Sequence, residues 1–209
     1  MSEQQIPQLA EAIVTHQRHL GNLSSDDAQW AIQNTVAAIG LFVDAVKNRT
    51  MTEVKKLLEF LFSFNAKAVE KFVAKEKFIE GKTTDGVSVS WLGENFKKNF
   101  LGKIERNVKA AELKVQKLLE TATDLPQEDE PGIIPELVGK HRTFLAHFFQ
   151  LLAHKQQTKD YSWLVGYICD ENGVLWTVGA YWFVDGWVVG ADSVVRPSRW
   201  SAGDQVLSR

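Results

Sequence analysis

The first three quarters of the chain repeat apolar residues at intervals of three and four. Ile32, Val36, Ile39, Val43 and Val46 are one such series, and this spacing places their side chains on one face of a helix. Segments with this spacing and helix-end signals span about 7–21, 24–49, 50–81, 91–121 and 135–158. Because the connections between them are short, the pattern predicts an up-and-down bundle of about five helices.

Two of these segments carry further detail. The fourth has apolar residues in alternating steps of three and four, a heptad pattern that favours close helix packing, at Leu101, Ile104, Val108, Ala111, Val115 and Leu118. In the third, Phe60 and Phe62 widen the apolar stripe, which predicts burial on more than one side. Between these two segments, Val87–Ser90 alternates weakly and is compatible with a short strand.

The pattern changes between Tyr161 and Trp200. Runs rich in β-branched and aromatic residues replace the helical spacing at 163–169, 174–184 and 187–195, and such residues are typical of strands. Turn residues separate the runs, at 170–173 and at Asp185-Gly186. This segment therefore predicts a three-stranded antiparallel meander, which needs a helix or partner to pack against.

The Asp185-Gly186 turn also predicts the pairing of the second and third strands. It places Trp182 opposite Val189 and Ala180 opposite Ala191. One face then carries Trp176, Val178, Ala180, Trp182, Val184, Trp187, Val189 and Ala191, and we expect it to pack on the helices. The other face carries Leu175, Thr177, Gly179, Tyr181, Phe183, Val188, Gly190, Asp192 and Val194. This second face is either a half-exposed sheet surface or a binding surface.

Helices followed by strands predict an α+β fold, with the meander packed on the N-terminal bundle. The domain boundary expected from this order separates a helical bundle at 1–157 from an aromatic-rich β segment at 158–209. The alternative is one composite domain. At 209 residues the chain is long enough for either arrangement.

Composition and charge exclude several classes of function. The net charge of −2 does not favour nucleic acid or an anionic membrane, and the lysines of the helical segments alternate with glutamates. A single cysteine, Cys169, excludes a disulfide within the chain and a cysteine-based metal site. The first residues lack a signal-peptide pattern, and the apolar run 36–43 is far shorter than a membrane span. We therefore expect a soluble, cytoplasmic protein.

The sequence contains no recognisable catalytic or metal-binding motif. It lacks a Walker loop, a dinucleotide-binding glycine pattern, a nucleophile elbow and the Glu-x-x-His of di-iron bundles. His16 and His141 fall at core-facing positions of predicted helices, where they either contribute to a ligand pocket or act as hydrogen-bonded core residues. We accordingly predict no catalytic residue, no metal and no cofactor.

The candidate binding residues lie in the β segment, at Trp163, Tyr167, Tyr181, Asp192, Arg196 and Arg199. Asp192 interrupts an apolar strand, so a buried carboxylate there would need Arg196 or Arg199 as its partner. Alternatively, Asp192 is a charge that keeps an edge strand from pairing with other molecules.

Aromatic density without catalytic groups favours a non-enzymatic interaction or assembly module, whose partner is another protein or a second copy. The alternative is a small-ligand sensor or enzyme with a pocket between the sheet and the fifth helix, near His141, Asp192 and Arg196.

Overall fold

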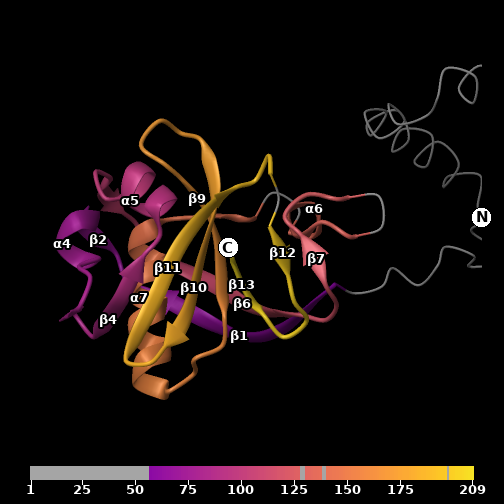
Figure 1. Ribbon diagram of the computed structural model, residues 1–209, viewed down its shortest axis with the longest axis horizontal. Coiled ribbons are helices and arrows are strands. Elements are labelled where there is room, and N and C mark those ends of the chain that lie inside the picture. Colours follow the sequence, from indigo (N-terminus) through magenta and orange to yellow (C-terminus); the bar gives the residue numbers. More distant parts are fainter. Residues whose placement is uncertain (1–56, 128–129, 138–139, 197) are drawn as a thin grey trace, which may run out of the picture. The chain divides into compact units, whose positions relative to one another are not determined.

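A mixed sheet of nine strands dominates the computed structural model, which describes residues 57–209 apart from 128–129, 138–139 and 197 (Figure 1). Eight strands lie side by side in the order β1 (Leu58–Ala66), β6 (Ala111–Leu118), β13 (Gln205–Ser208), β9 (Leu164–Cys169), β10 (Leu175–Phe183), β11 (Gly186–Ser193), β4 (Val87–Leu92) and β3 (Lys82–Thr84). The ninth, β8 (Arg142–Thr143), pairs with β9. The pairs β13–β9, β11–β4 and β8–β9 are parallel and the others antiparallel.

Two short ribbons and four helices complete the described part of the chain. The ribbons pair β2 (Val69–Val73) with β5 (Ile104–Val108), and β7 (Ala122–Thr123) with β12 (Arg199–Trp200). The helices are α4 (Ala74–Lys77), α5 (Glu94–Phe100), α6 (Ile133–Glu136) and α7 (Leu145–Thr158). Only α7 is long, and in Figure 1 β10 and β11 cross in front of it.

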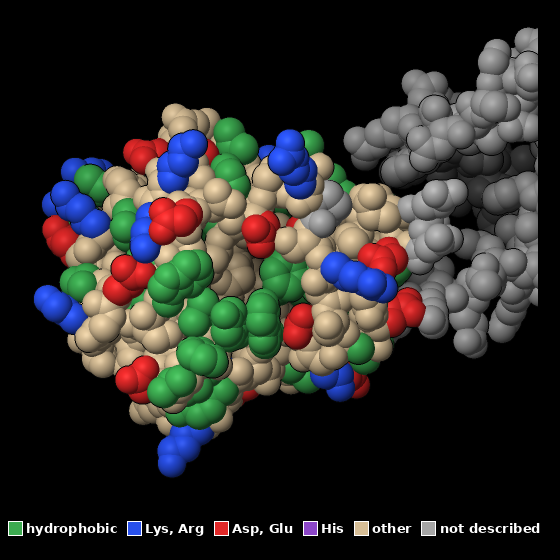
Figure 2. Space-filling view, viewed as in Figure 1, with side chains coloured by type: hydrophobic (Ala, Val, Ile, Leu, Met, Phe, Trp, Pro, Cys, Tyr) green, Lys and Arg blue, Asp and Glu red, His purple; other side chains and the backbone are tan. Residues whose placement is uncertain are grey.

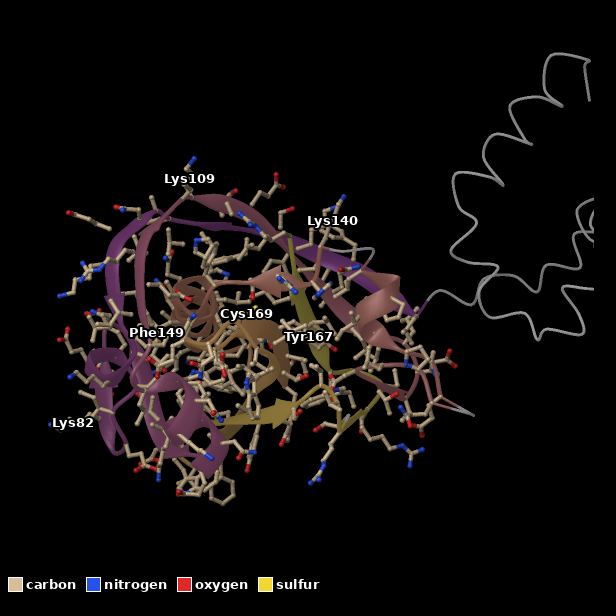
Figure 3. The ribbon with its side chains drawn as sticks, turned by 90° about the horizontal axis from the view of Figure 1, so that it is seen from above. Lys82, Lys109, Lys140, Phe149, Tyr167 and Cys169 are labelled. Atoms are coloured by element: carbon tan, nitrogen blue, oxygen red, sulfur yellow. The ribbon has the colours of Figure 1, made fainter. Side chains whose placement is uncertain are left out.

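The main core lies between α7 and one face of the sheet, which we call the inner face. Phe148, Leu151 and Leu152 of α7 are buried together with Val178, Ala180, Trp187 and Val189 of the sheet. Packing is close: a Cβ atom added to Gly166 would lie 2.9 Å from the Phe148 ring. Figure 3 shows Phe149 inside the molecule, whereas Lys82 and Lys109 point outward at its rim.

Buried charged groups hold both ends of α7. At its start, the Glu105 carboxylate accepts hydrogen bonds from the backbone N–H groups of Leu145 (3.0 Å) and Ala146 (2.8 Å). A carboxylate is favourable there because the first N–H groups of a helix have no partner within the helix. Near its end, Lys155 is fully buried and donates to Asp160 (2.6 Å) and Gln205 (2.8 Å). These contacts fix the helix against the sheet.

The predicted five-helix bundle and the α+β class are wrong, because the described residues are mainly β. The first two predicted helices lie outside the described residues. The third predicted helix contains β1, β2 and α4, the fourth contains α5, β5 and β6, and the fifth contains α6, β8 and α7. The predicted boundary after residue 157 falls at the last residue of α7, within one compact unit that spans Lys56–Arg209.

The error arose because these segments satisfy two periodicities at once. Phe60, Phe62 and Phe64 alternate with other residues in β1, and Leu113 and Val115 of β6 are both buried two positions apart. A spacing of two is the strand period. The long-range pairing between β1 and β6 outweighs the helical propensity of the lysines, glutamates and leucines within these two strands.

The strands predicted after Tyr161 are present as β9, β10 and β11, in the middle of the large sheet. Their register differs from the prediction: Trp182 pairs with Trp187 and Ala180 with Val189, so the two-residue turn is Val184-Asp185. Gly186 is not in the turn because β4 passes close to it, and a Cβ atom there would lie 2.8 Å from the Ser90 nitrogen. The shift is two residues, so each side chain keeps its predicted face.

Val184 shows the local cost of this register. It adopts a φ of 58°, which disfavours a β-branched residue, and its side chain is exposed rather than packed on the helices. The other predicted inward residues of β10 and β11 are buried or pack against the main core.

None of the helices in the described part of the chain is long and apolar enough to cross a membrane.

Candidate functional site

The outer face of the sheet, opposite α7, has a covered half and an open half. A second layer built from α6, β7 and β12 covers the first half. This layer buries a separate apolar cluster that includes Leu118, Ile133, Leu137, Val165, Tyr167, Trp200 and Val206. The open half lies over the β11 side of the sheet and has no such layer among the described residues.

The covered half is organised around a buried carboxylate. Asp124 is fully buried and accepts hydrogen bonds from the Tyr167 hydroxyl (3.0 Å), the Trp200 indole N–H (2.8 Å) and the Ser198 backbone N–H (3.1 Å). Burial raises the pKa of Asp124, and these hydrogen bonds oppose the rise. Burial and the neighbouring Asp124 also raise the pKa of Tyr167. The network joins the second layer to β9, which is a structural role.

The open half contains a groove that follows β11. The part of it that is a defined hollow has a volume of about 580 Å³ and is lined by Ser90, Trp91, Tyr181, Phe183, Val184, Asp185 and Val188. Val188 pairs with Tyr181 on one side and with Trp91 on the other, so two aromatic side chains flank it. The strands that carry these two aromatics are about 9–10 Å apart, twice the usual strand spacing. We call this hollow, together with the uncovered surface from Gly190 to Asp192, the β11 groove.

A pair of glycines marks the border between the two halves. Gly179 and Gly190 face each other across β10 and β11. A Cβ atom on Gly179 would lie 3.3 Å from the Trp200 ring, whereas one on Gly190 would have no atom within 4 Å. Trp200 therefore covers Gly179, and the floor of the groove at Gly190 is empty.

The aromatic walls of the groove are exposed and ordered by stacking. Trp91 is 48% exposed, Trp163 42% and Phe183 59%. The rings of Trp163 and Tyr181 stack with centroids 4.4 Å apart and an interplanar angle of 9°. Figure 2 shows hydrophobic side chains gathered across the middle of this face, over β10 and β11. Stacking fixes the orientation of the Trp163 and Tyr181 rings, so these two side chains have little entropy left to lose on binding.

Carboxylates stand at both ends of the groove. Asp185 lies in the turn before β11 and Asp192 near the end of that strand, and both are exposed. Neither makes a hydrogen bond or an ion pair with any residue that the structure describes. A cation on the wall, Lys97, lies 5.8 Å from the Trp91 ring centre and pairs with Glu80 (3.2 Å) and Glu94 (3.3 Å).

The structure brings together only some of the predicted site residues. Trp163 and Tyr181 stack beside the groove, and Asp192 lies at its end. Tyr167 is instead buried against Asp124, and His141 meets its ring edge-on at 6.1 Å. Arg199 pairs with Glu130 (2.6 Å) rather than with Asp192.

Arg196 is exposed beyond β11, and His16 lies outside the described residues. Asp192 lies on the outer face of the sheet, whereas α7 packs on the inner face. Asp192 therefore does not line a space between the sheet and α7, where the sequence predicted a pocket.

Sequence reasoning missed Trp91, which forms one wall. It was placed at the start of a predicted helix, but it lies in β4, and the weak alternation of Val87–Ser90 was the available signal. Val188 and Gly190 were placed on the correct face, but their role as a floor depends on β4 lying beside β11 in parallel. No local pattern encodes that pairing.

A larger hollow, of about 790 Å³, lies elsewhere, between β1, α7 and the turn at Asp85-Gly86. Its glutamines serve the fold: Gln150 bonds the Lys67 backbone (2.8 and 3.1 Å), and Gln156 bonds the Ser88 backbone (2.8 Å). His154 in this hollow packs against Phe64, with ring centres 5.4 Å apart. We consider the β11 groove the better candidate because its two carboxylates are unpaired and its aromatic groups are exposed.

Within the described ranges, no group of three or more His, Cys, Asp or Glu side chains is arranged to hold a metal ion. Cys169 is a free, half-buried thiol at the end of β9. Comparisons of the chain with protein-family models, with curated proteins and with solved structures found no match. The groove itself therefore carries the functional argument.

Proposed function

We propose that this protein is a binding module whose β11 groove holds an extended segment of a partner protein. The observation that carries the proposal is the contrast at Gly179 and Gly190: one half of the outer face is covered by Trp200, and the other half is unfilled between aromatic walls. Exposed, preoriented aromatic side chains around a pocket are typical of residues that dominate binding energy at interfaces.

The dimensions of the groove suit an extended polypeptide. The strand beneath it runs six residue steps from Gly186 to Asp192, which is about 20 Å, and its open floor begins at Val188. A bound segment of about six residues would present alternate side chains to the floor. One side chain would enter the hollow above Val188, and another would cover Gly190.

A partner segment fits the charges of the groove better than a second copy does. In a symmetric dimer the same surface meets itself, so groups at the two ends of one groove face groups of the other. Asp185 and Asp192 would then be brought near like charges, which is unfavourable. A groove is also concave and cannot fill another groove.

Selection from a random peptide library displayed on phage, with the full chain as target, tests this proposal. We expect enriched peptides with alternating apolar residues, and we expect the W163A/Y181A double variant to weaken their binding at least tenfold. Phe60→Ala is the matched control, because Phe60 is an equally exposed aromatic on β1, outside the groove. Near-UV circular dichroism checks that each variant is folded.

Three results would contradict the proposal. A library that yields no binder, or binders that W163A/Y181A does not affect, removes the groove as a peptide site. Sedimentation analysis that finds a dimer dissociated by W163A/Y181A would assign the groove to a second copy instead of a partner.

A further inference from the structure

The acids of the β11 groove form no ion pair within the described part of the chain. Asp185 lines the hollow directly, and Asp192 stands exposed at the opposite end of the strand. Two of the neighbouring cations are already engaged, since Lys97 pairs with Glu80 and Glu94, and Arg199 pairs with Glu130. Lys82, which lines a separate hollow with Asp185, and the exposed Arg196 form no ion pair with either acid within the described residues. Two unpaired carboxylates beside an apolar floor leave negative potential that a partner can neutralise.

The aromatic walls favour the same kind of group. A cation is attracted to the face of an aromatic ring, and Trp is the best such ring. Lys97 already occupies one such position over Trp91, at 5.8 Å from the ring centre. On the other side of the hollow, Tyr181 and Phe183 stand beside Asp185. A carboxylate next to aromatic rings suits a guanidinium group, which stacks on rings and donates two parallel hydrogen bonds to a carboxylate.

We propose that the segment bound in the β11 groove carries a basic side chain at each end, about six residues apart, with arginine preferred at the Asp185 end. This inference rests on the proposed function, because it names the chemistry of the partner at the same site. The apolar residues between the two basic ones contact Val188, Gly190 and the aromatic walls. The basic residues pair with Asp185 and Asp192.

Three peptide libraries with the same randomised apolar core test the inference. Their flanking positions, about six residues apart, are fixed as arginine, glutamine or glutamate. On the wild-type chain we expect the arginine-flanked library to be enriched at least tenfold over the glutamate-flanked one. The advantage shrinks as salt is raised, because exposed ion pairs are screened. Moving the arginines to three residues apart should remove most of it.

Charge reversal gives the sharpest arm of the test. The D185K/D192K variant should reverse the preference, so that glutamate-flanked peptides are enriched. Glu112→Lys is the matched control, because Glu112 is an exposed acid on β6, outside the groove. The D185N/D192N variant should remove the preference without reversing it, and it serves if charge reversal prevents folding.

The outcomes separate the two proposals. If all three libraries yield binders that W163A/Y181A abolishes, with no dependence on flanking charge, the charge inference is wrong and the protein-binding proposal stands. If no library yields a groove-dependent binder, both are wrong. A preference that Glu112→Lys changes as much as D185K/D192K does would also overturn the inference, since it would reflect net charge alone.

Discussion

The covered and open halves of the outer face share strand β10 but treat their side chains differently. In the covered half, Tyr167 and Trp200 give their polar hydrogens to the buried Asp124, and apolar groups fill the space between. In the open half, Trp163 and Tyr181 stack on each other, and none of the residues that the structure describes forms a second layer over the groove. The same residue types therefore stabilise the fold in one half and stay exposed in the other.

This difference separates stability from binding. A residue whose contacts are complete within the chain contributes to the free energy of unfolding, whereas one with an exposed aromatic face or an unpaired charge contributes little. Substitutions in the covered half should thus lower stability, and those in the open half should lower binding. The predictions below test this separation, beginning with the largest expected effect on stability.

Removing the buried carboxylate should have the largest effect. Asp124→Ala leaves the hydroxyl of Tyr167 and the indole N–H of Trp200 buried without an acceptor, at about 1–3 kcal/mol for each group. We expect a loss of about 3 kcal/mol or more in the free energy of unfolding, measured by urea denaturation. Asp124→Asn keeps one acceptor oxygen and should lose less. Equal stability of Asp124→Ala and the wild type would refute the role of the network.

The pH dependence of stability should reflect the same carboxyl. Because burial raises the pKa of Asp124, the folded state binds this proton more tightly than the unfolded state, whose pKa is about 3.9. The contribution of Asp124 is therefore complete below about pH 3.9 and is lost as the pH rises through the folded pKa. Urea denaturation from pH 4 to 7 should show wild type losing stability relative to Asp124→Asn. A relative gain would contradict this sign.

The paired glycines offer a closely matched comparison. Gly179→Val pushes a side chain against the Trp200 ring and should cost about 1–3 kcal/mol, the usual price of overpacking. Gly190→Val meets open space and should change stability by about 0.5 kcal/mol or less, while it fills the groove and weakens peptide binding at least tenfold. Thermal denaturation and calorimetric titration measure the two effects. Equal destabilisation by both would remove the distinction between the halves.

Charge removal at the ends of the groove should affect stability least. D185N/D192N removes two exposed, unpaired carboxylates, so we expect a change of about 0.5 kcal/mol or less in the free energy of unfolding. Binding of an arginine-flanked peptide should weaken, and its salt dependence should become shallower. A large loss of stability would show that these acids have a structural role, which would contradict our assignment.

The sequence predicts the features that depend on residues close together in the chain, and not those that depend on contacts between distant residues. Alternating runs and turn residues were sufficient to place β9, β10 and β11 and to assign Gly190 to the outer face. The turn was misplaced because Gly186 is needed where β4 passes, a contact between residues about a hundred positions apart. The helical prediction for β1 and β6 failed for the same reason, since their pairing is long-range.

The residues of the candidate site also differ in whether local sequence or distant contacts determine their position. Trp163, Tyr181 and Asp192 could be selected from the aromatic density and from the charge within a strand. Tyr167 could not be distinguished from them, because its burial depends on Asp124, which lies 43 positions away in the chain. Trp91 reaches the groove only through the parallel pairing of β4 with β11.

The most direct test of the central claim is an NMR titration that follows the tryptophan indole signals as an arginine-flanked peptide is added. Trp91 and Trp163 border the groove and are half-exposed, whereas Trp187 is buried in the main core and Trp200 is only 5% exposed. The account predicts that the signals of Trp91 and Trp163 shift together with the amide signal of Gly190, while that of Trp187 stays fixed. Shifts confined to other surfaces, or no shift at saturating peptide, would contradict it.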